Sequence, residues 1–208
     1  EFLEKPLTLL HILNDRRLRV PIKYKLFPTY IDPGFEKSFS RELLEYCISK
    51  GYNLRTEYTD FGLRAYSSKN RENPCFLCSR LRRKRLFEIA DRLGCTKLAL
   101  GHHKDDLIET LFLNMFYAGE ISSMQPMQPF FDGRFTIIRP LAFTDERLIK
   151  RFANDLDFPN FVNTCPSSTI SKRFEIKNML KELYKRNRKI KGNIFRSMQN
   201  VKPEYLLK

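Results

Sequence analysis

Strand-like segments alternate with segments of helical periodicity along most of this chain, and that alternation constrains the fold more than any other feature. We expect strands at residues 22–31, 52–59, 96–100 and 134–139. We expect the main helices at residues 7–15, 39–50, 78–93, 102–117 and 145–156. Helices that join successive strands make those strands parallel and cover both faces of the sheet. The sequence therefore predicts an α/β fold with a doubly wound, mostly parallel sheet, in which ligands bind at the carboxyl ends of the strands.

The chain changes character near residue 160. Residues 1–160 are expected to form the α/β domain, and residues 161–208 a basic helical C-terminal extension packed on it. Lys177, Lys181 and Lys185 recur at four-residue spacing in this extension. Such a stripe suits the phosphate backbone of RNA, but it is also typical of an ordinary solvated helix face.

The charge of the chain favours a polyanionic partner. Its 208 residues include 38 Lys and Arg against 24 Asp and Glu, which gives a net charge of +14. A field of this sign attracts nucleic acid, although a lysine-rich surface without such a partner has the same composition. No run approaches the roughly 18 apolar residues of a membrane span, and no secretory leader opens the chain. We therefore expect a cytoplasmic protein that does not enter the membrane.

Three cysteines have the spacing of a metal centre. Cys75 and Cys78 form a Cys-x-x-Cys pair, and Cys165 follows in a loop that precedes a helix. A Cys-x-x-Cys alone fits a redox dithiol, half a zinc site or chance, but a third thiolate favours a centre with one open coordination position. Cys47 and Cys95 have no partner motif and are expected to pack in the core or on the surface. The helix start and four nearby arginines should favour thiolates over thiols; these are Arg80, Arg82, Arg83 and Arg85.

A second polar cluster lies where a short strand leads into a helix, in the run Gly101-His102-His103-Lys104-Asp105-Asp106. Carboxylates at the end of a strand can hold Mg²⁺ together with the phosphates of a nucleotide. Acids in a first helical turn also serve as capping residues, so both interpretations stay open. A zinc site on the two adjacent histidines is the weaker interpretation.

These motifs together resemble the tRNA 2-thiocytidine synthetase family, and the likeness spans nearly the whole chain. It rests on the runs Pro74-Cys75-Phe76-Leu77-Cys78-Ser79-Arg80-Leu81-Arg82-Arg83, Ala99-Leu100-Gly101-His102-His103-Lys104-Asp105-Asp106, Leu111-Phe112-Leu113-Asn114-Met115-Phe116-Tyr117, Ile138-Arg139-Pro140-Leu141 and Met198-Gln199-Asn200-Val201. The family's fold is that of the PP-loop ATP pyrophosphatases, which are adenine nucleotide alpha hydrolase-like and usually dimeric.

The resemblance implies a two-stage reaction on a tRNA. ATP would adenylate the C2 oxygen of the cytidine at anticodon-loop position 32, and a sulfide would then displace AMP to give 2-thiocytidine. The implied cofactors are ATP, Mg²⁺ and a [4Fe-4S] cluster with one open iron, held by Cys75, Cys78 and Cys165. The implied partners are tRNA, a sulfur donor such as a cysteine desulfurase, and a second copy of the chain in a homodimer.

The resemblance also implies the residues of the nucleotide site. The nucleotide and its Mg²⁺ are expected at His102, Asp105 and Asp106, and Arg139 is expected to reach phosphate. Asp106 and Arg82 are the expected catalytic residues, with Arg82 near the phosphates or the substrate.

Two departures from the family pattern stand out. Members carry a Ser-Gly-Gly-x-Asp-Ser phosphate loop after their first strand, just before the position of Leu7, but this sequence reads Glu1-Phe2-Leu3-Glu4-Lys5-Pro6 there. Either that loop is omitted from the sequence or the chain is a truncated or inactive relative. Members also often have a cysteine at the position of Val162, so three ligands remain here.

Two other functions stay open on the sequence. A non-catalytic RNA-binding relative would use the cysteines to hold zinc as a structural staple. A lysidine-synthetase-like ligase would join an amine to an adenylated cytidine, and it would need none of Cys75, Cys78 and Cys165.

Overall fold

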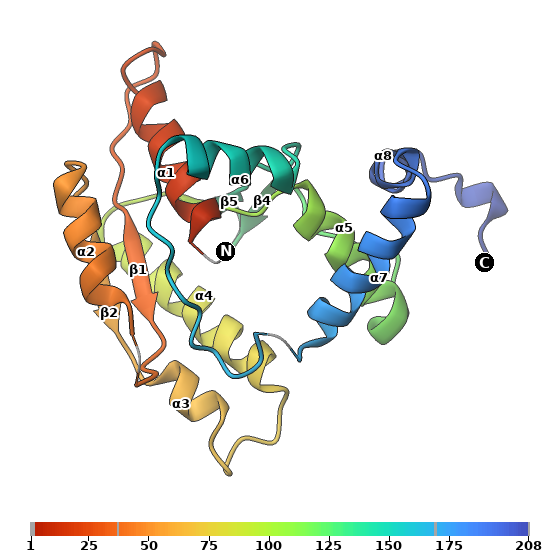
Figure 1. The fold of residues 1–208 in the computed structure, drawn as a ribbon, viewed down its shortest axis with the longest axis horizontal. Coiled ribbons are helices and arrows are strands. Elements are labelled where there is room, and N and C mark those ends of the chain that lie inside the picture. Colours follow the sequence, from red (N-terminus) through yellow and green to blue (C-terminus); the bar gives the residue numbers. More distant parts are fainter. Residues whose placement is uncertain (1–2, 37, 169, 208) are drawn as a thin grey trace.

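The strands of the computed structural model form two small sheets (Figure 1), and the description covers residues 3–36, 38–168 and 170–207. In the first sheet, β1 (Thr29–Asp32) pairs in parallel with β2 (Arg55–Tyr58). In the second, β3 (Lys97–Ala99) pairs in parallel with β5 (Phe135–Ile138), and β4 (Met127–Phe130) runs antiparallel at its edge. The parallel pairings confirm the predicted α/β class, whereas β4 is an addition to the predicted strands.

Helices separate the strands as expected. The helices are α1 (Glu4–Arg16), α2 (Ser40–Ser49), α3 (Phe61–Ala65), α4 (Pro74–Arg92), α5 (Lys104–Leu113), α6 (Glu146–Asp155), α7 (Lys172–Arg186) and α8 (Lys189–Ser197). A π-helical turn, Asn114–Ala118, extends α5, and a 3-10 turn, Pro203–Tyr205, lies near the C-terminus. Because α2 joins β1 to β2 and α4 joins β2 to β3, each crossover returns the chain to the start of the next strand.

The two predicted boundaries that differ most from the structure were wrong for local reasons. Only the last residues of the strand expected at 22–31 pair in a sheet, because Pro28 has no amide to donate, and Tyr24 instead donates its hydroxyl to the carbonyl of Leu13 in α1 (2.6 Å). The helix expected from residue 78 begins at Pro74. The side chain of Asn73 caps it, and proline is favoured at the first helical position.

A cavity of about 340 Å³ lies between β1 and β3. Its lining is mostly apolar and comes from α1, α4 and both strands. In the described part of the chain, β1 pairs only with β2 and β3 pairs only with β5. Members of the family that the sequence resembles have a strand and a phosphate loop just before the position of Leu7, which corresponds to residues 1–6 here. Residues 1 and 2 lie outside the described ranges, and α1 already begins at Glu4.

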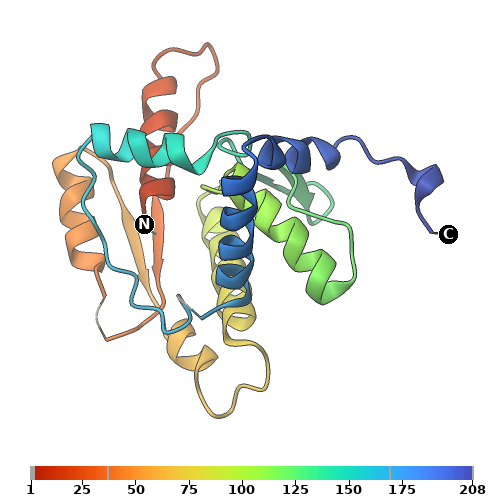
Figure 2. The ribbon, with the colours of Figure 1, turned by 45° about the vertical axis from the view of Figure 1, so that its right-hand side comes forward.

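The C-terminal helices pack on the α/β part through a shared apolar cluster. Ile108 of α5 lies with Ile176 and Leu180 of α7, and all three are buried. Figures 1 and 2 both show the segment after α8 leading away from the rest of the molecule. No helix in the described ranges combines the length and apolar character needed to cross a membrane. The division into residues 1–160 and 161–208 stays a prediction.

Candidate metal and nucleotide site

The first turn of α4 presents two of the three predicted metal ligands. The Asn73 side chain accepts hydrogen bonds from the amides of Cys75 (3.0 Å) and Phe76 (3.3 Å), which fixes the start of the helix. Cys75 and Cys78 are three residues apart, so they share one face of α4. Cys75 is exposed and Cys78 is half-buried. Because α4 leads from the carboxyl end of β2 back toward the start of β3, this turn lies at the ligand-binding edge expected for a parallel sheet.

Cys165 approaches from the connection between α6 and α7. Figures 1 and 2 show this connection running down to the region of α3 and α4 before it turns into α7. Sγ of Cys165 lies 3.7 Å from the hydroxyl of Tyr66, the residue that follows α3. The amide of Ser167 donates to the same hydroxyl (3.1 Å), and the amide of Cys165 donates to Oδ1 of Asn163 (3.0 Å). The fold therefore brings Cys165 to the end of α4 that bears Cys75 and Cys78.

The pKa of Cys78 depends on both of the other thiols. Burial raises the pKa of Cys78, and the nearby sulfurs of Cys165 and Cys75 raise it further, while Arg82 opposes the shift. The expectation that the arginine run favours a Cys78 thiolate was therefore wrong, because burial outweighs Arg82. Two of the other arginines have carboxylate partners: Arg80 pairs with Glu72 (2.8 Å) and Arg85 with Glu57 (2.7 Å).

The donor set consists of thiols, the residue type that holds iron–sulfur clusters. In the described ranges, no three His, Cys, Asp or Glu side chains close on one metal position. A [4Fe-4S] cluster gives each iron its own thiolate, so its ligands need not converge on one point. Cys75, Cys78 and Cys165 are all free thiols on neighbouring elements, which fits a cluster with three protein ligands.

The second polar cluster starts with an N-cap. His103 is fully buried and its Nδ1 accepts hydrogen bonds from the amides of Asp105 (3.1 Å) and Asp106 (3.4 Å). In return, Oδ2 of Asp106 accepts from the amide of His103 (3.0 Å). This reciprocal pair is a capping box, so the capping interpretation of Asp106 is confirmed.

The two acids are also ion-paired with distant basic residues. Oδ1 of Asp106 lies 3.1 Å from Nζ of Lys5, and Oδ1 of Asp105 lies 2.6 Å from Nζ of Lys191 in α8. Oδ2 of Asp105 accepts from the amide of Glu146 (2.9 Å). Burial alone raises the pKa of Asp106, but Lys5 and His103 outweigh it and hold that pKa below its ordinary value. Asp106 is therefore charged at neutral pH.

His102 and Arg139 meet beside this helix start. Nε of Arg139 donates to Nδ1 of His102 (3.3 Å), and its guanidinium also donates to the carbonyl of Gln125. Burial lowers the pKa of His102 to about 4, so the ring is neutral at pH 7 and its second nitrogen carries a proton. Arg139 is only 7% exposed, and burial together with the nearby Arg83 lowers its pKa. An anion that reached this side chain would meet a partly desolvated cation.

Gly101 lets α1 approach the end of β3. A Cβ at this position would lie 3.0 Å from the carbonyl carbon of Lys5 and 3.1 Å from the nitrogen of Pro6, so a side chain there would push α1 away. Lys5 reaches Asp106 across this contact. The carboxyl end of β3 and the first turn of α1 therefore lie directly against each other.

The structure thus gathers the predicted residues into two groups. One contains the three cysteines, and the other contains His102, Asp105, Asp106 and Arg139. Arg82 lies on α4, where it lowers the pKa of Cys78 and lines the cavity between β1 and β3. The assignment of the second group to a nucleotide and Mg²⁺ stays a prediction.

Sequence reasoning missed Tyr66, Ser167 and Lys5. The first two meet from positions 66 and 167, far apart in the sequence, so no local pattern points to their contact. Lys5 lies at the start of α1, where its pairing with Asp106 depends on the packing of that helix against β3. The Asn73-Pro74 pair, in contrast, is a recognisable cap-and-proline signal for the true start of α4.

Comparison with known proteins points to one family. No family model matches the chain. The tRNA-cytidine(32) 2-sulfurtransferase of Geobacter sulfurreducens is 39% identical over 203 residues, which cover 96% of this chain and 79% of that protein. The protein of the same name from Geotalea uraniireducens is 37% identical over 96% of this chain and 81% of its own length.

A solved structure has a similar fold. The U34-tRNA thiolase NcsA from Methanococcus maripaludis, solved with its [4Fe-4S] cluster, superposes with a TM-score of 0.77. The match covers 98% of this chain and 70% of that chain at 22% sequence identity. This likeness confirms the fold class.

Proposed function

We propose that this chain, which belongs to the tRNA-cytidine(32) 2-sulfurtransferase family, uses ATP and a [4Fe-4S] cluster to replace the C2 oxygen of a tRNA cytidine with sulfur. The observation that carries the proposal is the approach of Cys165 to the first turn of α4, next to Cys75 and Cys78. A structural zinc staple has a closed set of four ligands, whereas these three thiols leave one position open.

The chemistry proceeds in two transfers. The C2 oxygen of the cytosine attacks the α-phosphorus of ATP, pyrophosphate leaves, and the oxygen becomes part of an AMP leaving group. A sulfide then attacks C2, and the C2–O bond breaks as AMP departs. A bound cluster would supply the open iron position at which the incoming sulfide is held. Cys75, Cys78 and Cys165 would hold that group, and Arg82 would supply positive charge beside it, where anionic phosphates of the substrate would gather.

The group around α5 suits the nucleotide. The protonated ring nitrogen of neutral His102 and the desolvated Arg139 are donors for phosphate oxygens. Asp105 and Asp106 are charged oxygen donors of the kind that Mg²⁺ prefers. Mg²⁺ on these carboxylates would replace Lys5 and Lys191 as their charge partners, so we expect nucleotide binding to loosen both ion pairs.

The partners follow from the same proposal. The basic α7 and α8 supply charge for the tRNA backbone, and a sulfur donor such as a cysteine desulfurase supplies the sulfide. A homodimer, as expected from the family, completes the assembly.

The test is iron and acid-labile sulfide analysis on protein purified without oxygen, together with thiolation of a tRNA that carries cytidine at position 32. The variants are Cys75→Ala, Cys78→Ala and Cys165→Ala, with Cys95→Ala as the matched control. About four irons and four sulfides per chain should be lost in each of the three variants along with thiolation, and retained in the control. Zinc that stays bound without iron would support the RNA-binding alternative. If the three variants lose iron but still modify the tRNA normally, the result would support the ligase alternative.

A further inference from the structure

The hydroxyl of Tyr66 contacts the segment that carries Cys165, the third of the predicted metal ligands. Cys165 Sγ is 3.7 Å away, the amide of Ser167 donates to the hydroxyl at 3.1 Å, and the Ser167 side chain forms a further hydrogen bond with it. Cys75 is near enough for its charge to raise the pKa of Tyr66, after the effects of burial and of the Ser167 and Cys165 contacts. One phenol therefore touches the chain on both sides of Pro166.

The hydrogen-bond inventory of this phenol limits where its proton can go. A tyrosine hydroxyl has one proton to donate and two lone pairs that accept. The Ser167 amide can only donate, so it takes one lone pair. When the Ser167 hydroxyl donates to the other, the Tyr66 proton is left for Sγ of Cys165. A Cys165 thiolate has no proton to donate, so any hydrogen bond between the two groups then runs from the Tyr66 hydroxyl to the sulfur, and the negative charge strengthens it.

Tyr66 is itself held rigidly. It follows the short helix α3, and the amide of Gly62 in that helix donates to the carbonyl of Pro33 (2.7 Å). A Cβ on Gly62 would lie 2.6 Å from the ring of Phe35, so glycine is needed for this close approach. The Phe35 ring then packs edge-on against the ring of Tyr66, with centroids 6.0 Å apart. The phenol is thus fixed to the end of the first sheet.

We propose that Tyr66 is a positioning residue for the cluster. It anchors the connection between α6 and α7 through Ser167, and it donates a hydrogen bond to the Cys165 sulfur when that sulfur binds iron. This inference rests on the proposed function for the cluster, but the anchoring of Ser167 can be measured without it. A hydrogen bond to a ligand sulfur stabilises the reduced, more negative cluster, so it raises the reduction potential.

The experiment compares Tyr66→Phe with the matched control Tyr58→Phe, because Tyr58 is a 70% exposed tyrosine on β2. Amide hydrogen exchange on the cluster-free protein reports the anchor. The Ser167 amide should exchange several-fold faster in Tyr66→Phe, since it loses its acceptor, while amides of α4 stay unchanged. An EPR-monitored redox titration of the reconstituted protein reports the sulfur contact, and the midpoint potential should become more negative in Tyr66→Phe alone.

Each outcome separates the two proposals. Unchanged Ser167 exchange in Tyr66→Phe overturns the anchor, and an unchanged potential overturns the hydrogen bond to Cys165. If the wild-type protein takes up no iron while Ser167 exchange still rises in Tyr66→Phe, the cluster function fails and the anchor stands.

Discussion

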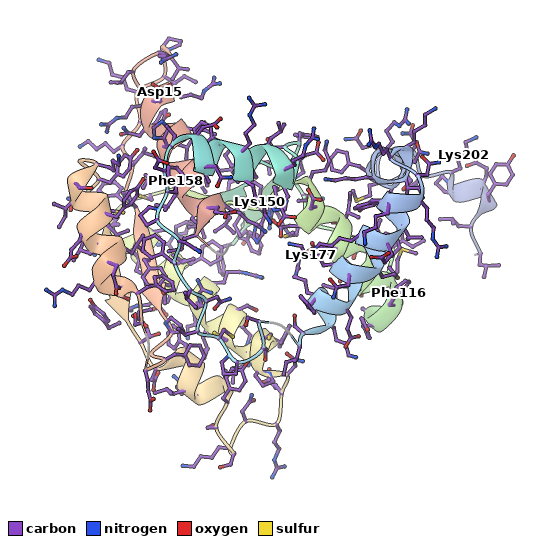
Figure 3. All side chains as sticks on the ribbon, viewed as in Figure 1. Asp15, Phe116, Lys150, Phe158, Lys177 and Lys202 are labelled. Carbon is purple, nitrogen blue, oxygen red and sulfur yellow. The ribbon has the colours of Figure 1, made fainter. Side chains whose placement is uncertain are left out.

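Lys191 in α8 places its Nζ 2.6 Å from Oδ1 of Asp105 at the start of α5, and the same ammonium also pairs with Asp145 just before α6. Three elements far apart in the sequence therefore share one cation. Lys177 of α7 adds a parallel link to Glu146 (2.7 Å; Figure 3). The basic C-terminal extension is thus partly used for internal pairing, and not all of its charge faces outward.

Removal of this cation should cost stability. In Lys191→Met, the half-buried Asp105 and Asp145 lose their shared partner, and we expect the free energy of unfolding to fall by ~2 kcal/mol. Lys185→Met is the control, because Lys185 pairs with Glu182 on an exposed surface, where such pairs contribute little. Urea titration at neutral pH measures both variants, and equal midpoints for the two would contradict the prediction.

Asp106 allows capping and catalysis to be separated. In Asp106→Asn, the amide oxygen can still accept from the His103 amide, so most of the cap survives, but the negative charge expected to hold Mg²⁺ is lost. In Asp106→Ala, the cap is lost as well, at ~1–2 kcal/mol. Thiolation should fall at least about 100-fold in both variants. A stable Asp106→Asn variant with normal thiolation would show that the residue is a cap alone.

Arg82 should matter for turnover and not for cluster content. Arg82→Gln keeps a shorter polar side chain near Cys78 but removes the positive charge expected to meet substrate phosphates. We expect thiolation to fall on the order of 100-fold with iron and sulfide unchanged. Arg92→Gln, at the opposite end of the same helix, is the control. Loss of iron together with activity would instead place Arg82 in the support of the cysteines.

The buried thiol of Cys47 should make the free energy of unfolding fall as the pH rises above 9. Burial raises its pKa to about 11, above the ordinary value of 9.0. As the pH rises past 9, the thiol ionises in the unfolded chain but not in the folded one, so stability is lost up to the folded pKa at ~1.4 kcal/mol per pH unit. Urea midpoints between pH 8 and 10.5 should fall less steeply in Cys47→Ala. Parallel slopes for wild type and variant would exclude this thiol as the cause.

Local sequence patterns predicted the elements that depend mainly on their own periodicity and turn residues. The parallel strands at residues 96–100 and 134–139 and the helix at residues 39–50 were predicted from periodicity and turn residues, and the structure confirms them. β4 was not predicted because it is only four residues long and contains Pro129. Among the described strands it pairs only with β5. Capping by His103 was also unexpected, since Ser, Thr, Asp and Asn are the usual N-cap residues.

In the candidate site too, some residues could be predicted from local motifs and others could not. The three cysteines were predicted as a set because their residue type and spacing carry chemical meaning. The partners of the acids, and the Tyr66 contact with Cys165, depend on the packing of α1, α3, α7 and α8, which no short motif encodes. Long-range packing therefore decides whether an acid in a recognisable motif is free for a ligand or already paired.

The place of Cys165 between α6 and α7 would give the proposed cluster a topological role. Positions 78 and 165 are 87 residues apart, and one cluster bound to both would tie that stretch of chain into a ring. In the chain-entropy treatment of cross-links, closing a ring of this size disfavours the unfolded chain by about 4 to 5 kcal/mol. Oxygen that destroys the cluster would thus open the ring, and the protein would become a better substrate for proteases at the same moment that it stops transferring sulfur.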